Sequence, residues 1–140
     1  MITENYIKMC EQAEEIQKLK KGKNQFSNQD FVAYNFGQGL KFYICNEINR
    51  YWTIQDLIWL PTLEQLIEMA HKARNKNAHY KSKEYEIIAD FIDWMLNSDI
   101  NKYKDFNLDF NDTKSCLLIY IMEEFYNKIW TGEKWEEITC

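Results

Sequence analysis

Four stretches of this chain carry apolar residues at the three- and four-residue spacing of an amphipathic helix, and this periodicity constrains the fold most strongly. The stretches cover residues 3–21, 62–73, 84–97 and 113–129. In the third stretch the residues at this spacing are Tyr85, Ile88, Ala89, Ile92, Met95 and Leu96. We therefore predict four helices.

Two of the predicted helices have recognisable start signals. Pro61 suits the beginning of a helix, and Thr62 followed three residues later by Gln65 has the form of a capping box. Asp112 or Thr113 can cap the last helix in the same way. The helix that starts at Thr62 is expected to bury Leu63, Leu66, Ile67 and Ala70.

Between the first two helices the composition changes to that of β-structure. Residues 30–60 are rich in aromatic and β-branched types, and Gly37-Gln38-Gly39 interrupts them, which predicts a strand-loop-strand unit. A second short hairpin is expected between Trp130 and Trp135, around Gly132. A chain of 140 residues without repeats or linkers suits one domain, so we predict a single, helix-dominated α+β domain over residues 1–140.

Composition excludes several classes of protein. A chain that is 46% hydrophobic and 16% aromatic, with a single proline, has the means to form a core and does not resemble a disordered chain. Its apolar runs are too short to cross a bilayer, and the N-terminus lacks the pattern of a signal peptide. We therefore expect a cytoplasmic protein that does not enter the membrane.

The cysteines and histidines give no sign of a metal or redox site. The four cysteines include no C-x-x-C pair, so free and mostly buried thiols are expected. The two histidines, His71 and His79, are eight residues apart and lack the spacing that places two ligands on one helix face. We predict no metal and no cofactor.

No catalytic motif is visible either. Asp90 and Asp93 lie on adjacent turns of one predicted helix and could act as an acid and a base, but such residues usually occupy a solvated helix face. Gly37-Gln38-Gly39 lacks the third glycine and the lysine of a phosphate-binding loop. The sequence therefore predicts a protein that is not an enzyme.

Charge is distributed unevenly along the chain. Residues 1–83 carry a net charge of +3 and residues 84–140 a net charge of −8. Residues 72–83 contain five cations, no acid, and a ring that could stack on a base, so an anionic nucleotide is a possible ligand there. The residues that would bind it are Lys72, Arg74, Lys76, His79, Tyr80 and Lys81.

The acidic portion predicts a different partner. Its carboxylates could imitate a row of phosphates on a basic protein surface, and aromatic side chains that we expect to be exposed could anchor the contact. The candidate acids are Asp99, Asp105, Asp109 and Asp112, and the candidate aromatics are Tyr103, Phe106, Phe110, Trp130 and Trp135. A charge run can also be an ordinary wet surface, so both interpretations stay open.

Three segments resemble a family of small phage and prophage proteins from low-GC bacteria. Residues 9–17 resemble its opening helix, residues 59–69 its W-L-P-x-x-x-Q-L-x-E-M element, and residues 122–135 its closing M-x-x-x-Y-N-K-x-W-x-G-x-x-W element. This sequence departs from the family pattern at Thr62, at Leu63 and over residues 115–120. The resemblance implies a phage origin, but no activity, substrate or catalytic residue.

The combined sequence evidence favours one function and leaves one alternative. We predict a non-catalytic phage accessory protein in the host cytoplasm that binds and inhibits a host protein, such as a component of bacterial immunity. The alternative is a nucleotide-binding protein that sequesters a defence signal on residues 72–83. The sequence leaves the oligomeric state open.

Overall fold

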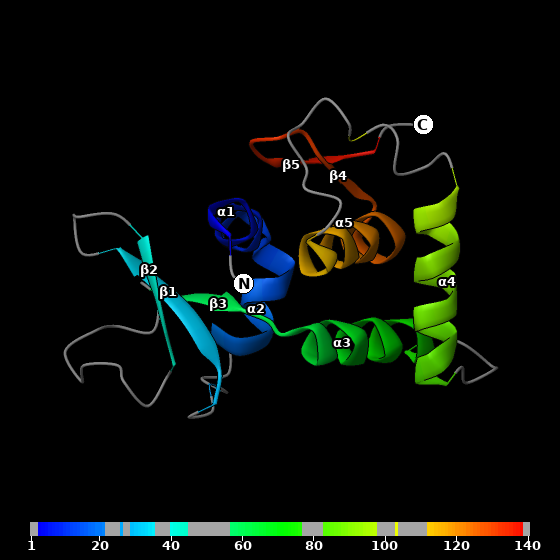
Figure 1. Cartoon of the computed structure of the whole chain (residues 1–140), viewed down its shortest axis with the longest axis horizontal. Helices are drawn as coiled ribbons and strands as arrows, with labels where there is room; N and C mark the ends of the chain where they lie inside the picture. The colour runs from blue at the N-terminus through cyan, green and yellow to red at the C-terminus, as the bar shows by residue number, and fades with distance from the viewer. Residues whose placement is uncertain are drawn as a thin grey trace. The chain divides into compact units, whose positions relative to one another are not determined.

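The fold is described by a computed structural model (Figure 1). The structure describes residues 3–21, 26, 29–35, 40–44, 57–76, 83–97, 103 and 112–138. Its internal contacts divide the chain into two compact units, Met1–Pro61 and Thr62–Cys140. The helix-dominated α+β class is confirmed, whereas one domain spanning the whole chain stays a prediction.

The first unit begins with two helices where the sequence predicted one. α1 covers Glu4–Gln12 and α2 covers Glu14–Lys21, and between them Ala13 leaves the helical region with a ψ of 79°. Ala13 is fully buried, and its N–H donates to the carbonyl of Cys10. The side-chain Nε2 of Gln17 donates to the same carbonyl at 3.0 Å, so the interrupted helix end is satisfied inside the protein.

Three strands of this unit form a small antiparallel sheet; the sequence predicted a sheet in this region, but only as a strand-loop-strand unit. The strands are β1 (Phe31–Asn35), β2 (Leu40–Ile44) and β3 (Ile58–Leu60), in the order β2-β1-β3. Val32 of β1 pairs with Tyr43 of β2 on one side and with Trp59 of β3 on the other. All three residues of β3 are buried, and both helices of the unit contact this strand.

The buried side chain of Gln17 connects α2 to the β3 strand. Its Oε1 accepts from the backbone N–H of Trp59 at 2.7 Å, and its Nε2 donates to the Trp59 carbonyl at 2.9 Å. These two bonds imitate the ladder of a further strand. An amide side chain therefore satisfies backbone groups at an edge of the sheet that would otherwise be buried without partners.

The second unit contains three helices and a hairpin. They are α3 (Leu63–Asn75), α4 (Glu84–Leu96) and α5 (Thr113–Tyr126), followed by β4 (Lys128–Trp130) and β5 (Trp135–Glu137). The predicted capping box of Thr62 and Gln65 is present in both directions, and Asp112 caps α5. The hairpin around Gly132 is also confirmed, and Asn127 ends α5 in the left-handed region with a φ of 55°.

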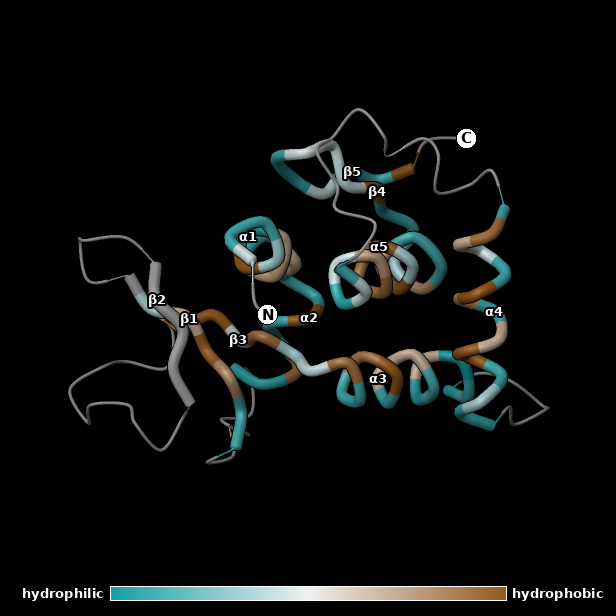
Figure 2. Tube along the Cα trace, in the orientation of Figure 1, coloured by the Kyte–Doolittle hydropathy of each residue, from teal (hydrophilic) through white to brown (hydrophobic). Residues whose placement is uncertain are grey.

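α5 is the central helix of the second unit. Eight consecutive residues, from Ser115 to Met122, are buried, so this helix is enclosed on all sides along two turns. Within its unit α5 contacts α3, α4 and β4 (Figure 1). Figure 2 shows hydrophobic segments in the tube of this helix. The core of this unit is therefore built around α5.

Two of the four cysteines fall in the described part of the chain. Cys10 and Cys116 are buried free thiols, as expected, whereas Cys45 and Cys140 lie outside the described residues. Among the helices that the structure describes, none combines the length and the apolar character needed to cross a membrane.

Candidate functional site

The inner face of α4 attaches this helix to α5 through aromatic rings. Phe91 and Trp94 are buried, and both rings lie against Tyr120 of α5, with centroid distances of 5.7 Å each. Trp94 also approaches the ring of Tyr103 at 6.4 Å. With the fully buried Ile87, these rings complete one apolar face of α4.

A second apolar face of α4 is exposed. Tyr85, Ile88, Ile92 and Leu96 expose 63%, 41%, 51% and 81% of their surface. Successive residues of a helix are rotated by about 100°, so these side chains and that of Ala89 form one stripe, on the side away from Phe91 and Trp94. We call this set, Tyr85, Ile88, Ala89, Ile92 and Leu96, the α4 stripe.

The α4 stripe is the feature that the sequence periodicity detected, but it does not face the core. The spacing of its residues correctly predicted a helix, whereas the buried face is made of Ile87, Phe91 and Trp94. The larger aromatic rings pack against Tyr120 and Tyr103 and take the inner position. The sequence did not predict that these residues form an exposed surface. The signal was present, because α4 carries apolar residues on two faces and a helix needs only one apolar face to pack on its own core.

The charges on α4 all have one sign. Between Glu84 and Leu96 the helix contains four acids and no lysine, arginine or histidine. Helix geometry places Glu86 and Asp93 along one edge of the α4 stripe, and Glu84 beside its first turn. The remaining acid, Asp90, is turned further from the stripe, and its Oδ2 lies 2.6 Å from Nη1 of Arg74. The stripe is therefore an apolar surface with an acidic edge.

Arg74 was predicted to bind an anionic ligand, but its side chain joins three helices of its own unit. Besides the ion pair with Asp90 of α4, its Nη2 donates to the Tyr120 hydroxyl at 3.3 Å, and its guanidinium lies 6.0 Å from the Phe125 ring centroid. Burial raises the pKa of Tyr120, and the nearby Glu124 adds to this effect, so the hydroxyl stays neutral. Through these contacts, Arg74 takes part in the packing of α3 against α4 and α5.

The other residues of the predicted nucleotide site are only partly described. Lys72 is exposed and lies 2.9 Å from Glu68 one turn earlier on α3, and Lys76 is exposed at the end of that helix. The sequence predicted that this helix ends at residue 73, which is wrong, because α3 continues through Asn75. His79, Tyr80 and Lys81 lie outside the described residues, so nucleotide binding stays a prediction.

Two of the aromatic residues expected at a partner surface are buried, so that expectation is wrong for them. Tyr103 exposes 1% of its surface and Trp130 exposes none. The Tyr103 hydroxyl donates to Oε2 of Glu123 at 2.9 Å, and burial together with this carboxylate raises the pKa of Tyr103. Trp130 packs on Trp135 across the hairpin, with ring centroids 5.1 Å apart. Both side chains therefore belong to the core instead of to an exposed surface.

The other residues predicted to bind a partner protein are in part described by the structure. Asp112 is the N-cap of α5, where its carboxylate accepts hydrogen bonds from the backbone and hydroxyl of Ser115. Trp135 is partly exposed on the outer strand of the hairpin. Asp99, Asp105, Phe106, Asp109 and Phe110 lie outside the described residues, and their role in partner binding stays a prediction.

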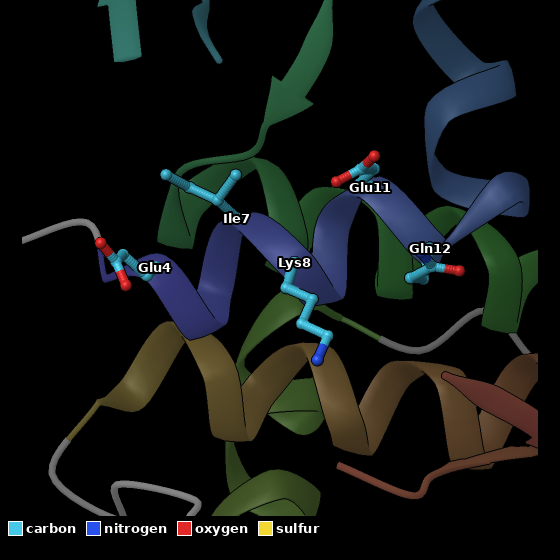
Figure 3. A pocket seen from close by; sticks show the side chains of 5 residues that line it. All are labelled: Glu4, Ile7, Lys8, Glu11 and Gln12. Carbon is cyan, nitrogen blue, oxygen red and sulfur yellow. The ribbon is translucent and has the colours of Figure 1, made fainter. Parts of the chain in front are cut away.

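An open pocket of about 400 Å³ lies along α1 (Figure 3). Its described lining residues all belong to this helix: Glu4, Ile7, Lys8, Glu11 and Gln12. They follow one another at helical spacing, with Glu4 one turn before Lys8 and Glu11 one turn after it in the sequence. This is the chemistry of an ordinary solvated helix face, so we do not assign a ligand to it.

Metal and cofactor chemistry has no visible site in the described part of the chain. No group of three or more histidine, cysteine and acidic side chains is placed there to hold a metal ion. His71 is engaged within α3, where its Nε2 lies 2.9 Å from Nδ2 of Asn75. The predicted absence of a metal and of a cofactor stays a prediction.

Comparison with known proteins finds no relative of this chain. No family model, no curated protein and no solved structure matches this chain.

Proposed function

We propose that this chain is a non-catalytic binding protein that acts by occupying a surface of another protein. The observation that carries the proposal is the exposed α4 stripe. Large apolar side chains that recur along three turns of one helix form a contiguous patch, and such patches mark interaction sites on folded domains. A few anchors of this kind supply most of the binding energy of an interface.

The chemistry of the surface supports binding over catalysis. From Glu84 to Leu96 the chain has no serine, threonine, cysteine, histidine or lysine. The helix therefore offers none of these side chains as a nucleophile or base, and only two of its acids, Glu86 and Asp93, lie along the edge of the stripe. A partner that covers the apolar side chains gains the free energy of removing them from water.

The identity of the target class comes from the sequence resemblance. A small phage accessory protein acts inside the host cell, so we propose the host cytoplasm as its location and a component of bacterial immunity as its target. Occupying a functional surface of that target would inhibit it. The net charge of −5 favours a basic partner, because complementary charge speeds encounter.

The test is affinity purification of the tagged chain from the host, with the wild type beside two variants. Ile92→Glu places a charge in the α4 stripe. Leu19→Glu is the matched control, because Leu19 is an apolar residue of α2 that is 43% exposed. We expect mass spectrometry to find a host protein with the wild type and with Leu19→Glu, but not with Ile92→Glu.

Two results would contradict the proposed function. One is recovery of the same proteins with Ile92→Glu as with the wild type, and the other is recovery of no host protein at all. Thermal unfolding of all three proteins is measured in parallel. Equal midpoints show that loss of the partner is not loss of the fold.

A further inference from the structure

We propose that the partner contacts the α4 stripe with a basic amphipathic helix. In this arrangement, apolar side chains of the partner cover Ile88 and Ile92, while lysines or arginines face the acidic edge at Glu86 and Asp93. The proposal rests on the proposed function, since it names the chemistry of the partner at the same surface. Three features of α4 carry it.

The first feature is the shape of the exposed surface. From Tyr85 to Leu96 the α4 stripe covers three turns of helix, a length of about 16 Å at a rise of 1.5 Å per residue. Its members recur at intervals of three, four and seven residues, which is the spacing at which one helix packs along another. A partner helix of about three turns therefore matches it in length and periodicity.

The second feature is the charge beside that surface. α4 contains four acids and no base, so the helix carries only negative side-chain charge beside the stripe. Glu86 and Asp93 are seven residues apart and lie on one edge of the stripe. Cations seven residues apart on a partner helix fall on the same row, so each edge carboxylate can be matched by one lysine or arginine.

The third feature is what the same charges exclude. A second copy of this chain that docked through its own α4 would bring a second acidic edge, with the same Glu86 and Asp93, into the interface, and like charges across an interface oppose association. Helices that lie on membranes carry lysine and arginine on their polar face and are attracted to anionic lipid. α4 has the opposite charge, so a basic protein segment is the occupant that fits.

The test uses the full chain and two synthetic helical peptides with identical leucines, one with lysines and one with glutamates at its polar positions. Fluorescence anisotropy of the labelled peptides measures binding. We expect the lysine peptide to bind and the glutamate peptide not to bind. We expect Ile92→Ser to lower the affinity for the lysine peptide at least tenfold. Leu19→Ser, the matched change on α2, is expected to leave that affinity unchanged.

A second variant isolates the contribution of the acidic edge. Glu86→Gln combined with Asp93→Asn keeps the size of both side chains and removes their charge. We expect the affinity for the lysine peptide to fall several-fold, and its dependence on salt concentration to become flatter. Unfolding midpoints close to that of the wild type confirm that these variants keep the fold.

Four outcomes would overturn the proposal. They are no binding of the lysine peptide, binding that is equal for both peptides, binding that Ile92→Ser leaves unchanged, and a salt dependence that the edge variant does not alter. Sedimentation equilibrium showing a dimer that Ile92→Ser dissociates would assign the stripe to a second copy. Flotation with phosphatidylglycerol vesicles that requires Ile92 would assign it to lipid.

The proposal and the proposed function can fail separately. If a host protein is captured through Ile92 but the lysine peptide does not bind, the binding function stands and the basic-helix proposal is wrong. If no host protein depends on Ile92, the proposed function fails, and the basic-helix proposal fails with it.

Discussion

α4 and α5 lie in the same unit and are both apolar around most of their circumference, but their surroundings differ. On α5, eight consecutive residues from Ser115 to Met122 are buried. On α4, Ile87, Phe91 and Trp94 are buried, while Tyr85, Ile92 and Leu96 are exposed. Figure 2 shows hydrophobic segments in the tubes of both helices. The apolar character of α5 is explained by the folding of this chain. The core of this chain explains the apolar residues on the buried face of α4. It does not explain the apolar residues of the exposed α4 stripe, for which we propose contact with another protein.

The largest expected effect comes from the same substitution made in both helices. Leu118→Ala removes a fully buried side chain of α5, and we expect the free energy of unfolding to fall by about 2–5 kcal/mol, because a cavity is left in the core. Leu96→Ala removes a side chain of α4 that is 81% exposed, and a change within about 0.5 kcal/mol is expected. Urea denaturation measures both. Equal losses would show that the α4 stripe belongs to the core.

A pH effect tests the enclosed aromatic cluster between α4 and α5. The pKa of Tyr103 is raised by burial and by Glu123, so the folded chain keeps the phenol protonated at a pH where the unfolded chain ionises it. Its stabilising contribution is complete below the unfolded pKa of about 10 and is lost as pH rises beyond it, with a slope of up to about 1.4 kcal/mol per pH unit.

The control for this effect is Tyr103→Phe, which removes the ionisable group and keeps the ring. We expect the decline in stability above pH 10 to be less steep in the variant than in the wild type, by urea denaturation across the alkaline range. A decline of the same steepness in both proteins would contradict the burial of Tyr103 beside Trp94.

A smaller effect distinguishes the two basic residues at the end of α3. Arg74→Ala removes contacts with Asp90, Tyr120 and Phe125, and we expect a loss of about 1 kcal/mol because the pair is partly exposed. Lys72→Ala removes an exposed pair with Glu68 one turn away, and a change within about 0.5 kcal/mol is expected. If the Lys72 variant loses more stability than the Arg74 variant, Arg74 does not join the helices of this unit.

The sequence predicted local structure better than the surroundings of each element. The capping box at Thr62, the cap at Asp112 and the hairpin around Gly132 depend on neighbouring residues, so their signals are local and were correct. The interruption at Ala13 was not predicted, because it depends on Gln17, whose side chain also binds a β3 strand 42 residues away. A contact at that separation leaves no periodic signal.

The candidate surface was misplaced for a similar reason. Tyr103 and Trp130 stand in polar sequence, which favoured an exposed position, but they are buried by contacts with Trp94 and Trp135. On α4 the sequence contains two apolar stripes, and periodicity alone cannot decide which one is buried. That choice is made by aromatic packing against Tyr120, a residue that lies far along the chain.

The central claim is that the α4 stripe contacts a basic helix of another protein, and site-specific photo-crosslinking in the host tests it most directly. p-Benzoylphenylalanine is introduced in place of Ile92, and in place of Leu19 as the matched control. We predict that position 92 alone gives a crosslink, to a segment with apolar residues at helical spacing and lysine or arginine along one edge. Crosslinks that are the same at both positions, or that join position 92 to a second copy of this chain or to an acidic segment, would contradict the account.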